Sequence, residues 1–407
     1  MSKLIYNIGV IFLYITIKIS ASLNSAKAKN WIYGRQNWKN SINRINKTKS
    51  SIWIHAASHG EGLMAIPLIK KLSLEYPKKN IIISFFSPSG FINFNYQHEN
   101  LIKLYLPIDY KKNAEFILKT IQPEILIFVK YDFWFNLITT AQELKIPTLC
   151  FSTKVEMNKW YLKSFWKWQN KSLKQLSSIL TVDKKSHLNL KEKGFLNSGI
   201  CGDTRYDQIN LNPNKNLSLE ILKPCIIIGS SWEKEEKAVK NIIEELNEFQ
   251  IIIAPHDISS KRILELTSLF GNKCKLYSEI SNSIPNVLII DNIGILADLY
   301  ELSNIAIIGG GFSGKLHNII EPAAKGNHIL FGPNIDKFPE AKEMVNKGLA
   351  NIFNNSQELL FLIKNHKDFS SENSKKHILN KQGATNIVFE KCKELMSYSN
   401  ISASSRI

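Results

Sequence analysis

The stretch Ile305–Ala341 reads IAIIGGGFSGKLHNIIEPAAKGNHILFGPNIDKFPEA and decides the fold prediction. An apolar run at 305–308 ends in three consecutive glycines, and a helix-like segment from about 317 to 325 leads to a second apolar run at 328–331. A strand, a helix and a second strand in this order form a βαβ unit, the building block of a parallel sheet. Glycine has no Cβ, so three glycines at a strand end let the backbone turn sharply and approach a ligand. The stretch therefore predicts a nucleotide site built by a βαβ unit.

The glycine triplet, Gly309–Gly311, fits no familiar nucleotide motif. It matches neither G-x-G-x-x-G with an acidic residue about 20 positions on, nor a Walker loop ending in G-K-[ST]. A tight turn without a ligand would explain the triplet equally well. Glu321 favours a ligand: one turn after His317, its carboxylate could accept hydrogen bonds from ribose hydroxyls while the glycines and the helix N-terminus face a phosphate. Alone, Glu321 would pass for an ordinary acid on a helix surface.

Strand-like and helix-like segments alternate along the rest of the chain. A polar stretch, Asn210–Asn216, interrupts the rhythm, and a second series begins after it. This pattern predicts an α/β fold with two Rossmann-like domains, with ligands at the carboxyl ends of the strands in the cleft between the halves. We expect a membrane-associating segment at 1–30, one domain at 31–212, a second at 213–375, and a C-terminal helix and tail at 376–407 that packs back on the first half. Besides the two apolar runs above, strands are expected at 51–55, 81–86, 101–106, 124–129, 147–151, 178–182, 225–228, 250–254 and 286–291.

Composition limits the classes of partner. The chain has 407 residues, enough for two or three domains, and a formal net charge of +17. Only five of the 52 basic residues are arginine, and the abundance of Asn, Ile and Lys makes part of the charge incidental. A lysine-rich face attracts anionic lipid or a phosphorylated substrate. Nucleic acid is not expected, because no recognition motif is present and lysine reads bases poorly.

The first 20 residues and the cysteines indicate the compartment. Leu4–Ile19 is almost wholly apolar but shorter than the ~20 residues of a spanning helix, and it lacks a small-residue cleavage site. The basic stretch Lys27–Lys49 that follows favours a cytoplasmic location for the bulk of the chain. We expect membrane association, by a short span or an interfacial helix; a buried core helix is the alternative. The five cysteines are far apart without zinc-binding spacing, so free thiols are expected.

Glu61 is the candidate catalytic residue. The first expected strand ends in HAASHGEG, 55–62, where small residues leave room for a substrate beside one carboxylate. At a helix start the carboxylate would meet the positive end of the dipole, which would keep it ionised and able to accept a proton. A helix-capping acid explains the same position.

Polar side chains at other strand ends could each have a ligand-binding role or a structural role. Ser230 could bind phosphate, although an N-cap by Ser231 accounts for the same sequence; His256 could contact phosphate or a base, or be structural. Arg205 could clamp an anion or pair with a neighbouring aspartate. No D-x-D sequence, the usual holder of a metal and a diphosphate, occurs in the chain, so a metal-free site is expected.

In this order the motifs resemble those of the 3-deoxy-D-manno-octulosonic acid (Kdo) transferases of lipopolysaccharide synthesis. The similarity extends from the N-terminal segment to about residue 345. The similar stretches are His55–Glu61, Pro88–Gly90, Leu106–Asp109, Asp132–Asn136, Gly202–Asp207, Pro255–His256, Gly309–Phe312, His317–Asn318, Glu321 and Phe331–Asn334.

The resemblance implies a glycosyltransferase of the GT-B fold that holds CMP-Kdo in the second domain and a lipid A precursor, lipid IV(A), in the first. It also implies attachment to the cytoplasmic side of the inner membrane and an inverting transfer without metal or other cofactor. Glu61 corresponds to the general base that deprotonates the acceptor hydroxyl. With the residues argued above, the expected donor-binding set is Ser230, Pro255, His256, Gly309, Gly310, Gly311, Phe312, His317, Asn318 and Glu321.

The chain departs from the family at one position. The family carries a Glu-x-Glu-Leu-Trp-Pro pattern where this chain has KYDFWF, 130–135, so Lys130 replaces a carboxylate. We expect Lys130, Asp132 and Arg205 on the acceptor side or in its charge balance; Lys130 could bind the Kdo carboxylate or a lipid A phosphate. The alternatives are another GT-B enzyme of envelope synthesis (a UDP-sugar lipid glycosyltransferase or an epimerase) and a catalytically silent, membrane-bound binding protein.

Overall fold

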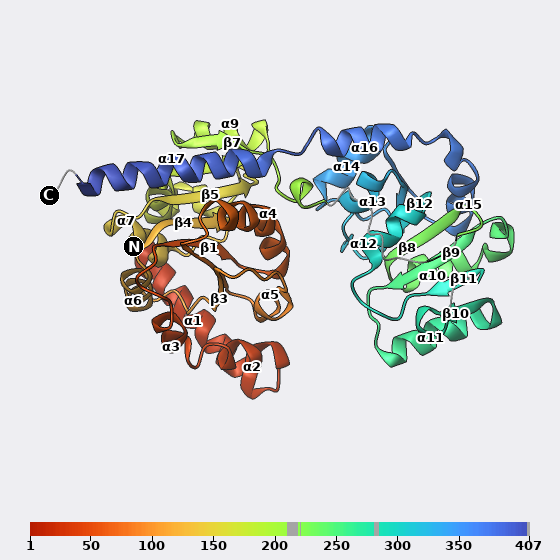
Figure 1. The fold of residues 1–407 in the computed structure, drawn as a ribbon, viewed down its shortest axis with the longest axis horizontal. Coiled ribbons are helices and arrows are strands. Elements are labelled where there is room, and N and C mark those ends of the chain that lie inside the picture. Colours follow the sequence, from red (N-terminus) through yellow and green to blue (C-terminus); the bar gives the residue numbers. More distant parts are fainter. Residues whose placement is uncertain (210–218, 220, 281–284, 405–407) are drawn as a thin grey trace. The chain divides into compact units, whose positions relative to one another are not determined.

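The computed structural model describes residues 1–209, 219, 221–280 and 285–404, which form two units (Figure 1). The first unit contains Met1–Gln208 and Lys381–Ile407, and the second contains Ile209–Asn380. Each unit holds one seven-stranded sheet in which neighbouring strands are parallel. The predicted α/β class with two Rossmann-like domains is confirmed. The polar stretch Asn210–Asn216 and the expected boundary at 212 lie outside the described residues.

The first sheet reverses its strand order at β1. Its order is β3-β2-β1-β4-β5-β6-β7, so the chain builds outward from β1 to β3 and then continues on the other side of β1 with β4. Open parallel sheets bind ligands outside the carboxyl ends of the strands at such a reversal. The strands are β1 (Ser51–Ala56), β2 (Asn80–Phe85), β3 (Leu101–Tyr105), β4 (Pro123–Val129), β5 (Thr148–Thr153), β6 (Ser178–Thr181) and β7 (Ser198–Ile200).

Helices cover both faces of this sheet, and the C-terminal helix is one of them. Asp207 fixes the start of α17, because its carboxylate accepts hydrogen bonds from the N–H groups of Gly383 and Thr385, each at 2.6 Å. Val388, Phe389 and other side chains of α17 then join the core under β1, β2 and β4. The helices are α4 (His59–Glu75), α5 (Pro88–Asn93), α6 (Lys111–Ile121), α7 (Phe135–Glu143), α8 (Lys167–Lys174), α9 (Lys184–Glu192) and α17 (Ala384–Ser404).

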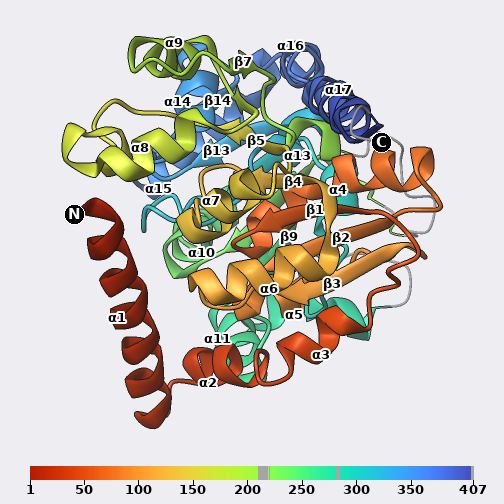
Figure 2. The ribbon, with the colours of Figure 1, turned by 90° about the vertical axis from the view of Figure 1, so that its left-hand side faces the viewer.

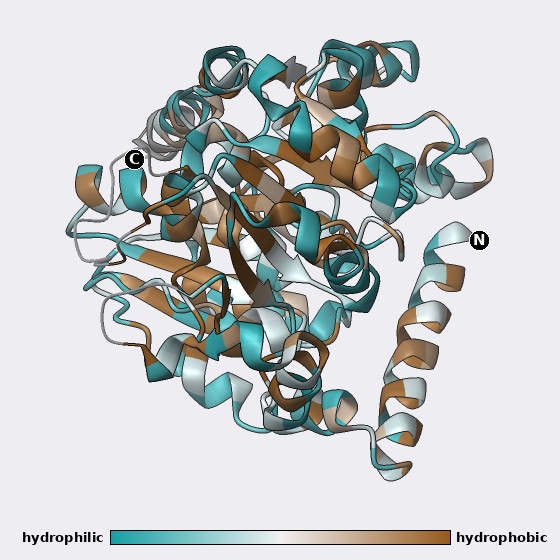
Figure 3. Ribbon diagram, turned by 90° about the vertical axis from the view of Figure 1, so that its right-hand side faces the viewer, coloured by the Kyte–Doolittle hydropathy of each residue, from teal (hydrophilic) through white to brown (hydrophobic). Residues whose placement is uncertain are grey.

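The N-terminal helix α1 (Ser2–Ser22) lies along the first unit, followed by α2 (Ala26–Tyr33) and α3 (Trp38–Asn43) (Figures 2 and 3). By length and composition α1 is apolar enough to cross a membrane, with a mean hydropathy of 1.8 and 11% of that window buried. One side is anchored to the unit: the Tyr6 hydroxyl donates to Asp109 Oδ2 at 2.6 Å and accepts from the Phe135 N–H at 3.2 Å. The opposite side exposes Leu4, Ile8, Ile11, Phe12, Ile15 and Ile19.

The second sheet repeats the reversal, at β8. Its order is β10-β11-β9-β8-β12-β13-β14, so β9 and β12 flank the first strand. The strands are β8 (Cys225–Ser231), β9 (Gln250–Pro255), β10 (Cys274–Leu276), β11 (Val287–Ile289), β12 (Ile305–Ile308), β13 (His328–Phe331) and β14 (Ala350–Ile352). The helices are α10 (Glu233–Lys240), α11 (Ser260–Phe270), α12 (Leu296–Leu299), α13 (Ile320–Lys325), α14 (Pro339–Asn346), α15 (Ser356–Lys364) and α16 (Ser371–Leu379).

The βαβ unit that decided the prediction is present, with a shorter helix than expected. Strands β12 and β13 have the predicted bounds and are neighbours in the sheet. α13 begins at Ile320 rather than about 317, with Ile319 as its N-cap. The Asn318 side chain accepts from the Ile320 N–H at 2.9 Å and so forms a turn just before the helix. The helix therefore has only six residues.

The three glycines after β12 allow close backbone contacts within the second unit. A Cβ at Gly309 would lie 1.9 Å from the Ser230 carbonyl oxygen, and one at Gly310 would lie 2.2 Å from the Lys315 carbonyl oxygen. A Cβ at Gly311 would lie 2.4 Å from the N atom of Gly332. Because these glycines have no side chains, the backbone after β12 can pack directly against the backbone at Ser230, Lys315 and Gly332.

We predict that Gly309→Ala destabilises the second unit by about 3 kcal/mol or more, because its Cβ would overlap a backbone carbonyl that cannot move away. Gly348→Asn is the control: Gly348 has a φ of +67° and open space around its Cβ position. Asparagine tolerates this conformation, so about 1 kcal/mol or less should be lost. Urea unfolding followed by circular dichroism measures both, and equal stabilities for the two variants would contradict the packing argument.

Candidate functional site

One candidate site lies in the first unit, at the carboxyl ends of β1 and β4. α4 begins shortly after β1, and Glu61 is its third residue. Glu61 Oε2 accepts hydrogen bonds from the N–H groups of Ala57 at 2.6 Å and Ser58 at 3.1 Å, as the acid of a capping box does. Oε1 accepts none from the residues that the structure describes. One oxygen therefore fixes the carboxyl group, and the other is left for a ligand.

Burial weakens the acidity of Glu61. Its pKa is raised above the ordinary value, first by burial and then by the negative charge of Asp132. Lys130, the hydrogen bond from Ala57 and His55 act in the opposite direction. We expected the helix N-terminus to keep this carboxylate ionised; the loss of hydration is the larger effect. A raised pKa makes the ionised carboxylate a stronger base.

A hydrogen-bonded network fixes Asp132 beside Glu61. His55 is fully buried; its Nδ1 lies 2.9 Å from Ser84 Oγ and its Nε2 lies 2.9 Å from Asp132 Oδ2. The indole N–H of Trp134 donates to the same Asp132 oxygen at 2.7 Å. His55 was not among the site residues expected from the sequence, although a histidine within the mostly apolar strand SIWIHA, 51–56, was the available signal.

The segment after β4 turns sharply at Lys130. Lys130 has a φ of +62°, which is rare for a residue with a side chain. Its N–H donates to the Phe151 carbonyl at 2.9 Å, and its own carbonyl accepts from the Thr153 hydroxyl at 2.6 Å. Hydrogen bonds to β5 thus hold the strained turn, and the turn brings the ammonium group close enough to lower the pKa of Glu61.

Arg205 forms an ion pair with a neighbouring aspartate, which is one of the two roles expected for it. Its guanidinium donates to Asp203 Oδ2 at 2.7 Å, in the segment after β7. The charges that shift the pKa of Glu61 are those of Asp132, Lys130 and His55, and Arg205 is not among them.

A second candidate site, in the second unit, is a cluster of rings at the carboxyl ends of β8, β9 and β12. Trp232 stacks on His256 with ring centroids 5.1 Å apart and an interplanar angle of 12°. His317 lies 4.6 Å from His256, and its Nε2 accepts a hydrogen bond from the Trp232 indole N–H at 3.1 Å. The Lys315 ammonium lies 5.5 Å from the centroid of the Trp232 ring. The sequence predicted both histidines for the donor side, and Trp232 is the member that it did not predict.

His317 is held in its neutral form. Burial, and then the neighbouring His256, lower the pKa of His317 to about 4. The neutral ring is also what the hydrogen bond from Trp232 requires, because a protonated imidazole has no acceptor nitrogen. Near neutral pH this cluster therefore offers flat, polarisable faces, with Lys315 as the cation beside them.

Glu321 and Asn318 lie together at the start of α13. Burial raises the pKa of Glu321, while a hydrogen bond with the Asn318 side chain and the charge of Lys325 lower it. Burial, and then the charge of Glu321, raise the pKa of Tyr300. A half-buried carboxylate at a strand-to-helix junction is a suitable acceptor for hydroxyl groups of a ligand.

The glycine turn differs from the expected phosphate cradle. The Gly309 N–H donates to the Gly229 carbonyl at 2.9 Å, and the Gly310 N–H donates to Glu235 Oε1 at 3.0 Å. Two of the three N–H groups are thus occupied, while that of Gly311 donates to no residue that the structure describes. With six residues, α13 also provides little dipole for a phosphate.

Three further residues expected on the donor side contribute to the walls around this turn. Ser230 has a φ of +50° and presents its carbonyl to Gly309. Pro255 ends β9, where it is paired with Ser231. The Phe312 ring packs edge to face on Phe353 with centroids 5.3 Å apart. Within the described ranges, no group of three or more His, Cys, Asp or Glu side chains is arranged to hold a metal ion.

Comparison with known proteins identifies a family that matches most of the first unit and relatives that match most of the chain. The family of 3-deoxy-D-manno-octulosonic-acid transferases (Kdotransferase) matches residues 36–208. A 3-deoxy-D-manno-octulosonic acid transferase of Aquifex aeolicus is 25% identical over 310 residues, which cover 74% of this chain and 82% of that protein. The resemblance to the Kdo transferases is confirmed, and these homologues indicate a glycosyltransferase.

Another relative is longer than this chain. A bifunctional glycosyltransferase/methyltransferase of Fusobacterium nucleatum is 27% identical over 368 residues, and the match covers 84% of this chain but only 57% of that protein. Among solved structures, a UDP-N-acetylglucosamine 2-epimerase aligns with a TM-score of 0.58 at 14% identity, covering 86% of this chain and 96% of its own. A calicheamicin glycosyltransferase aligns with a TM-score of 0.55 at 10% identity, covering 86% and 98%. These structures show that the fold is of the GT-B type.

We predict that acid destabilises the second unit through His317. A base with a lowered pKa in the folded chain stabilises it above its ordinary pKa of 6.5, and this contribution is lost as the pH falls through about 4. His317→Asn removes the group, so its free energy of unfolding should fall less between pH 6.5 and 4 than that of the wild type. Urea unfolding of both proteins followed by circular dichroism measures the difference. Identical pH dependences would show that His317 does not titrate in this way.

Proposed function

We propose that this protein transfers Kdo from CMP-Kdo to a lipid A precursor, lipid IV(A), as an inverting glycosyltransferase of lipopolysaccharide synthesis. The observation that carries the proposal is the Glu61 carboxyl group at the reversal point of the first sheet. Two backbone N–H groups fix one of its oxygens, and the other accepts no hydrogen bond from the described residues. The family match over 36–208 and the Kdo transferases among the relatives support the choice of sugar.

In the proposed reaction Glu61 Oε1 accepts the proton of the acceptor hydroxyl. The hydroxyl oxygen forms a bond to the anomeric carbon of Kdo while the bond from that carbon to the CMP phosphate oxygen breaks, and CMP leaves with the bonding electron pair. A single displacement of this kind inverts the anomeric configuration and needs one base, because CMP is a good leaving group. General base catalysis of this kind contributes typically 10²–10⁴-fold to a rate. The proposal assigns no step to a metal ion.

The donor is assigned to the second unit. In this assignment the cytosine ring lies against the cluster formed by Trp232, His256 and His317, whose stacked faces suit a flat heterocycle. Glu321 accepts hydrogen bonds from the ribose hydroxyls. The remaining N–H, that of Gly311, and the Lys315 ammonium approach the phosphate.

Lys130 is assigned a charge-balancing role on the acceptor side. Two carboxylates, Glu61 and Asp132, lie at one strand junction, and without a cation each would oppose the ionisation of the other. Lys130 keeps Glu61 ionised at a lower pH than burial and Asp132 alone would allow. It also leaves a positive charge beside the site that suits a phosphorylated acceptor.

We assign membrane attachment to α1 and the first unit to the cytoplasmic side of the inner membrane. The helix has a row of exposed apolar side chains along one side and is anchored to the unit on the other. A helix packed along the surface of a soluble unit cannot also stand across a bilayer, so α1 lies in the interface.

We predict that Glu61→Gln abolishes transfer and leaves donor binding intact. The amide oxygen of glutamine can still accept from Ala57 and Ser58, so the turn should keep its structure, while the amide cannot accept a proton. Mass spectrometry of a tetraacylated lipid A precursor incubated with CMP-Kdo measures the product, and we expect its rate of formation to fall 10²-fold or more.

The companion measurement is a thermal shift with CMP-Kdo and with UDP-sugars. Both the wild type and Glu61→Gln should be stabilised by CMP-Kdo and not by UDP-sugars. If only a UDP-sugar stabilises the protein, CMP-Kdo is not the donor. If the wild type binds CMP-Kdo but forms no product, the protein is a catalytically silent binding protein. A Glu61→Gln variant with wild-type turnover would remove Glu61 as the base.

We predict opposite shifts of the pH profile for substitutions of the two charges beside Glu61. The rate falls at low pH as Glu61 becomes protonated. Lys130→Met removes the charge that lowers the Glu61 pKa, so the acidic limb of kcat/KM should move to higher pH; Asp132→Asn removes a charge that raises it, so the limb should move to lower pH. Lys112→Met, at an exposed position of α6, should move neither. Shifts in the same direction for both variants would rule out Glu61 as the titrating group.

A further inference from the structure

A hollow of about 780 Å³ lies on the outer side of α8, and all the charged residues that line it are lysines. Ten residues line it, of which five are lysine and none is acidic. In the whole chain, by comparison, 52 of 407 residues are lysine or arginine. None of the five pairs with a carboxylate among the residues that the structure describes. The lining residues that define this lysine hollow are Met157, Leu162, Lys163, Ser164, Lys167, Asn170, Lys171, Lys174, Gln175 and Lys193.

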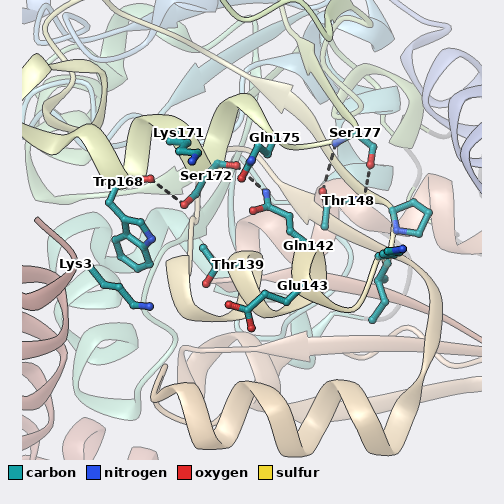
Figure 4. Close-up of a pocket in the computed structure, with 13 residues that line it drawn as sticks. Lys3, Thr139, Gln142, Glu143, Thr148, Trp168, Lys171, Ser172, Gln175 and Ser177 are labelled. Atoms are coloured by element: carbon teal, nitrogen blue, oxygen red, sulfur yellow. Dashed lines mark hydrogen bonds between the residues drawn. The ribbon is translucent and has the colours of Figure 1, made fainter.

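A second hollow, of about 590 Å³, adjoins it on the other side of α8 (Figure 4). The two share Lys171 and Gln175. Lys3 from α1 and Thr148 at the start of β5 also line the second hollow. Because β5 has six residues at about 3.3 Å each, that edge of the sheet lies about 20 Å from the carboxyl ends where Glu61 lies. These hollows are therefore separate from the candidate site.

The residues around the lysine hollow are of the kinds found where proteins contact lipid headgroups. Trp160 and Phe165 lie in the segment that forms its rim and are 44% and 53% exposed. Exposed aromatic rings next to lysines are typical of proteins at the level of lipid headgroups. The start of α1 is attached to α8, because the Trp168 N–H donates to Ser2 Oγ at 3.2 Å and Tyr6 packs on the Trp168 ring. Figure 2 shows α1 and α8 along the same side of the first unit.

We propose that the lysine hollow binds the phosphate headgroup of an anionic phospholipid and so fixes the orientation of the first unit on the bilayer. This inference rests on the membrane attachment assigned above and adds to it a specific headgroup site. The apolar row of α1 by itself would allow the unit to rotate about the helix axis. A second contact at the α8 end of the helix, made by charge rather than by apolar burial, removes that freedom.

The test is vesicle binding by Lys167→Gln/Lys171→Gln/Lys174→Gln. Its matched control is Lys78→Gln/Lys184→Gln/Lys185→Gln, which removes the same charge from exposed positions of the same unit. A lysine at an anionic surface contributes about fivefold, so the hollow variant should bind phosphatidylglycerol vesicles on the order of a hundredfold more weakly, with a smaller salt dependence. The control should lose a few-fold at most, and neither should change on phosphatidylcholine. Equal losses in the two variants would overturn the proposal.

Three further experiments distinguish a lipid headgroup from other phosphate-bearing ligands. Displacement of the wild type from vesicles by inorganic phosphate, but not by chloride at equal ionic strength, would assign the hollow to a free phosphate instead. A raised KM for a detergent-dispersed acceptor in the hollow variant would assign it to the acceptor. Binding of an oligonucleotide that the hollow variant loses would assign it to nucleic acid. We expect none of these.

The outcome is independent of the proposed activity. If the wild type forms no Kdo product yet binds anionic vesicles through the hollow, the transferase proposal fails and the headgroup site remains. If the wild type forms product in detergent and the hollow variant binds vesicles as tightly as the wild type, the headgroup site fails alone.

Discussion

The candidate site of each unit depends on one topological constraint, the reversal of strand order at the first strand of its sheet. Because parallel strands require right-handed crossovers, the chain can extend a sheet to one side of its first strand, return, and continue on the other side. The segments that leave the first strand and its neighbour on the other side then diverge. Glu61 follows β1 and Lys130 follows β4, while Trp232 follows β8 and the glycine turn follows β12.

Within that frame, burial and charge compete at Glu61. A carboxylate at a helix N-terminus gains about 0.3–1 kcal/mol from the dipole, whereas the desolvation of a buried charge costs several kcal/mol. The net effect is a raised pKa, to which Asp132 adds and from which Lys130 subtracts. The strained φ of Lys130 belongs to the same balance, because hydrogen bonds to β5 hold the turn that directs its ammonium group. The departure from the family pattern at Lys130 thus has a local electrostatic consequence.

The sequence could predict what depends on local pattern. The runs 305–308 and 328–331 are strands with those bounds, because buried parallel strands are continuous apolar runs. The short strands β7, β10 and β14 were not predicted, since three residues give no periodicity. The start of α13 was placed too early because the turn that the Asn318 side chain forms before the helix depends on its side-chain conformation. The contacts of Trp232 with His317 and of Glu235 with Gly310 join residues 85 and 75 positions apart, which one sequence cannot reveal.

The central claim is that Glu61 is a half-buried carboxyl group with a raised pKa. The most direct measurement is a pH titration of the carboxyl carbon of Glu61 by NMR on protein labelled with ¹³C at glutamate, with Glu61→Gln used to assign the resonance. The structure predicts a midpoint above the ordinary 4.5 of a glutamic acid. A midpoint at or below 4.5 would contradict the account, because the helix N-terminus would then outweigh burial.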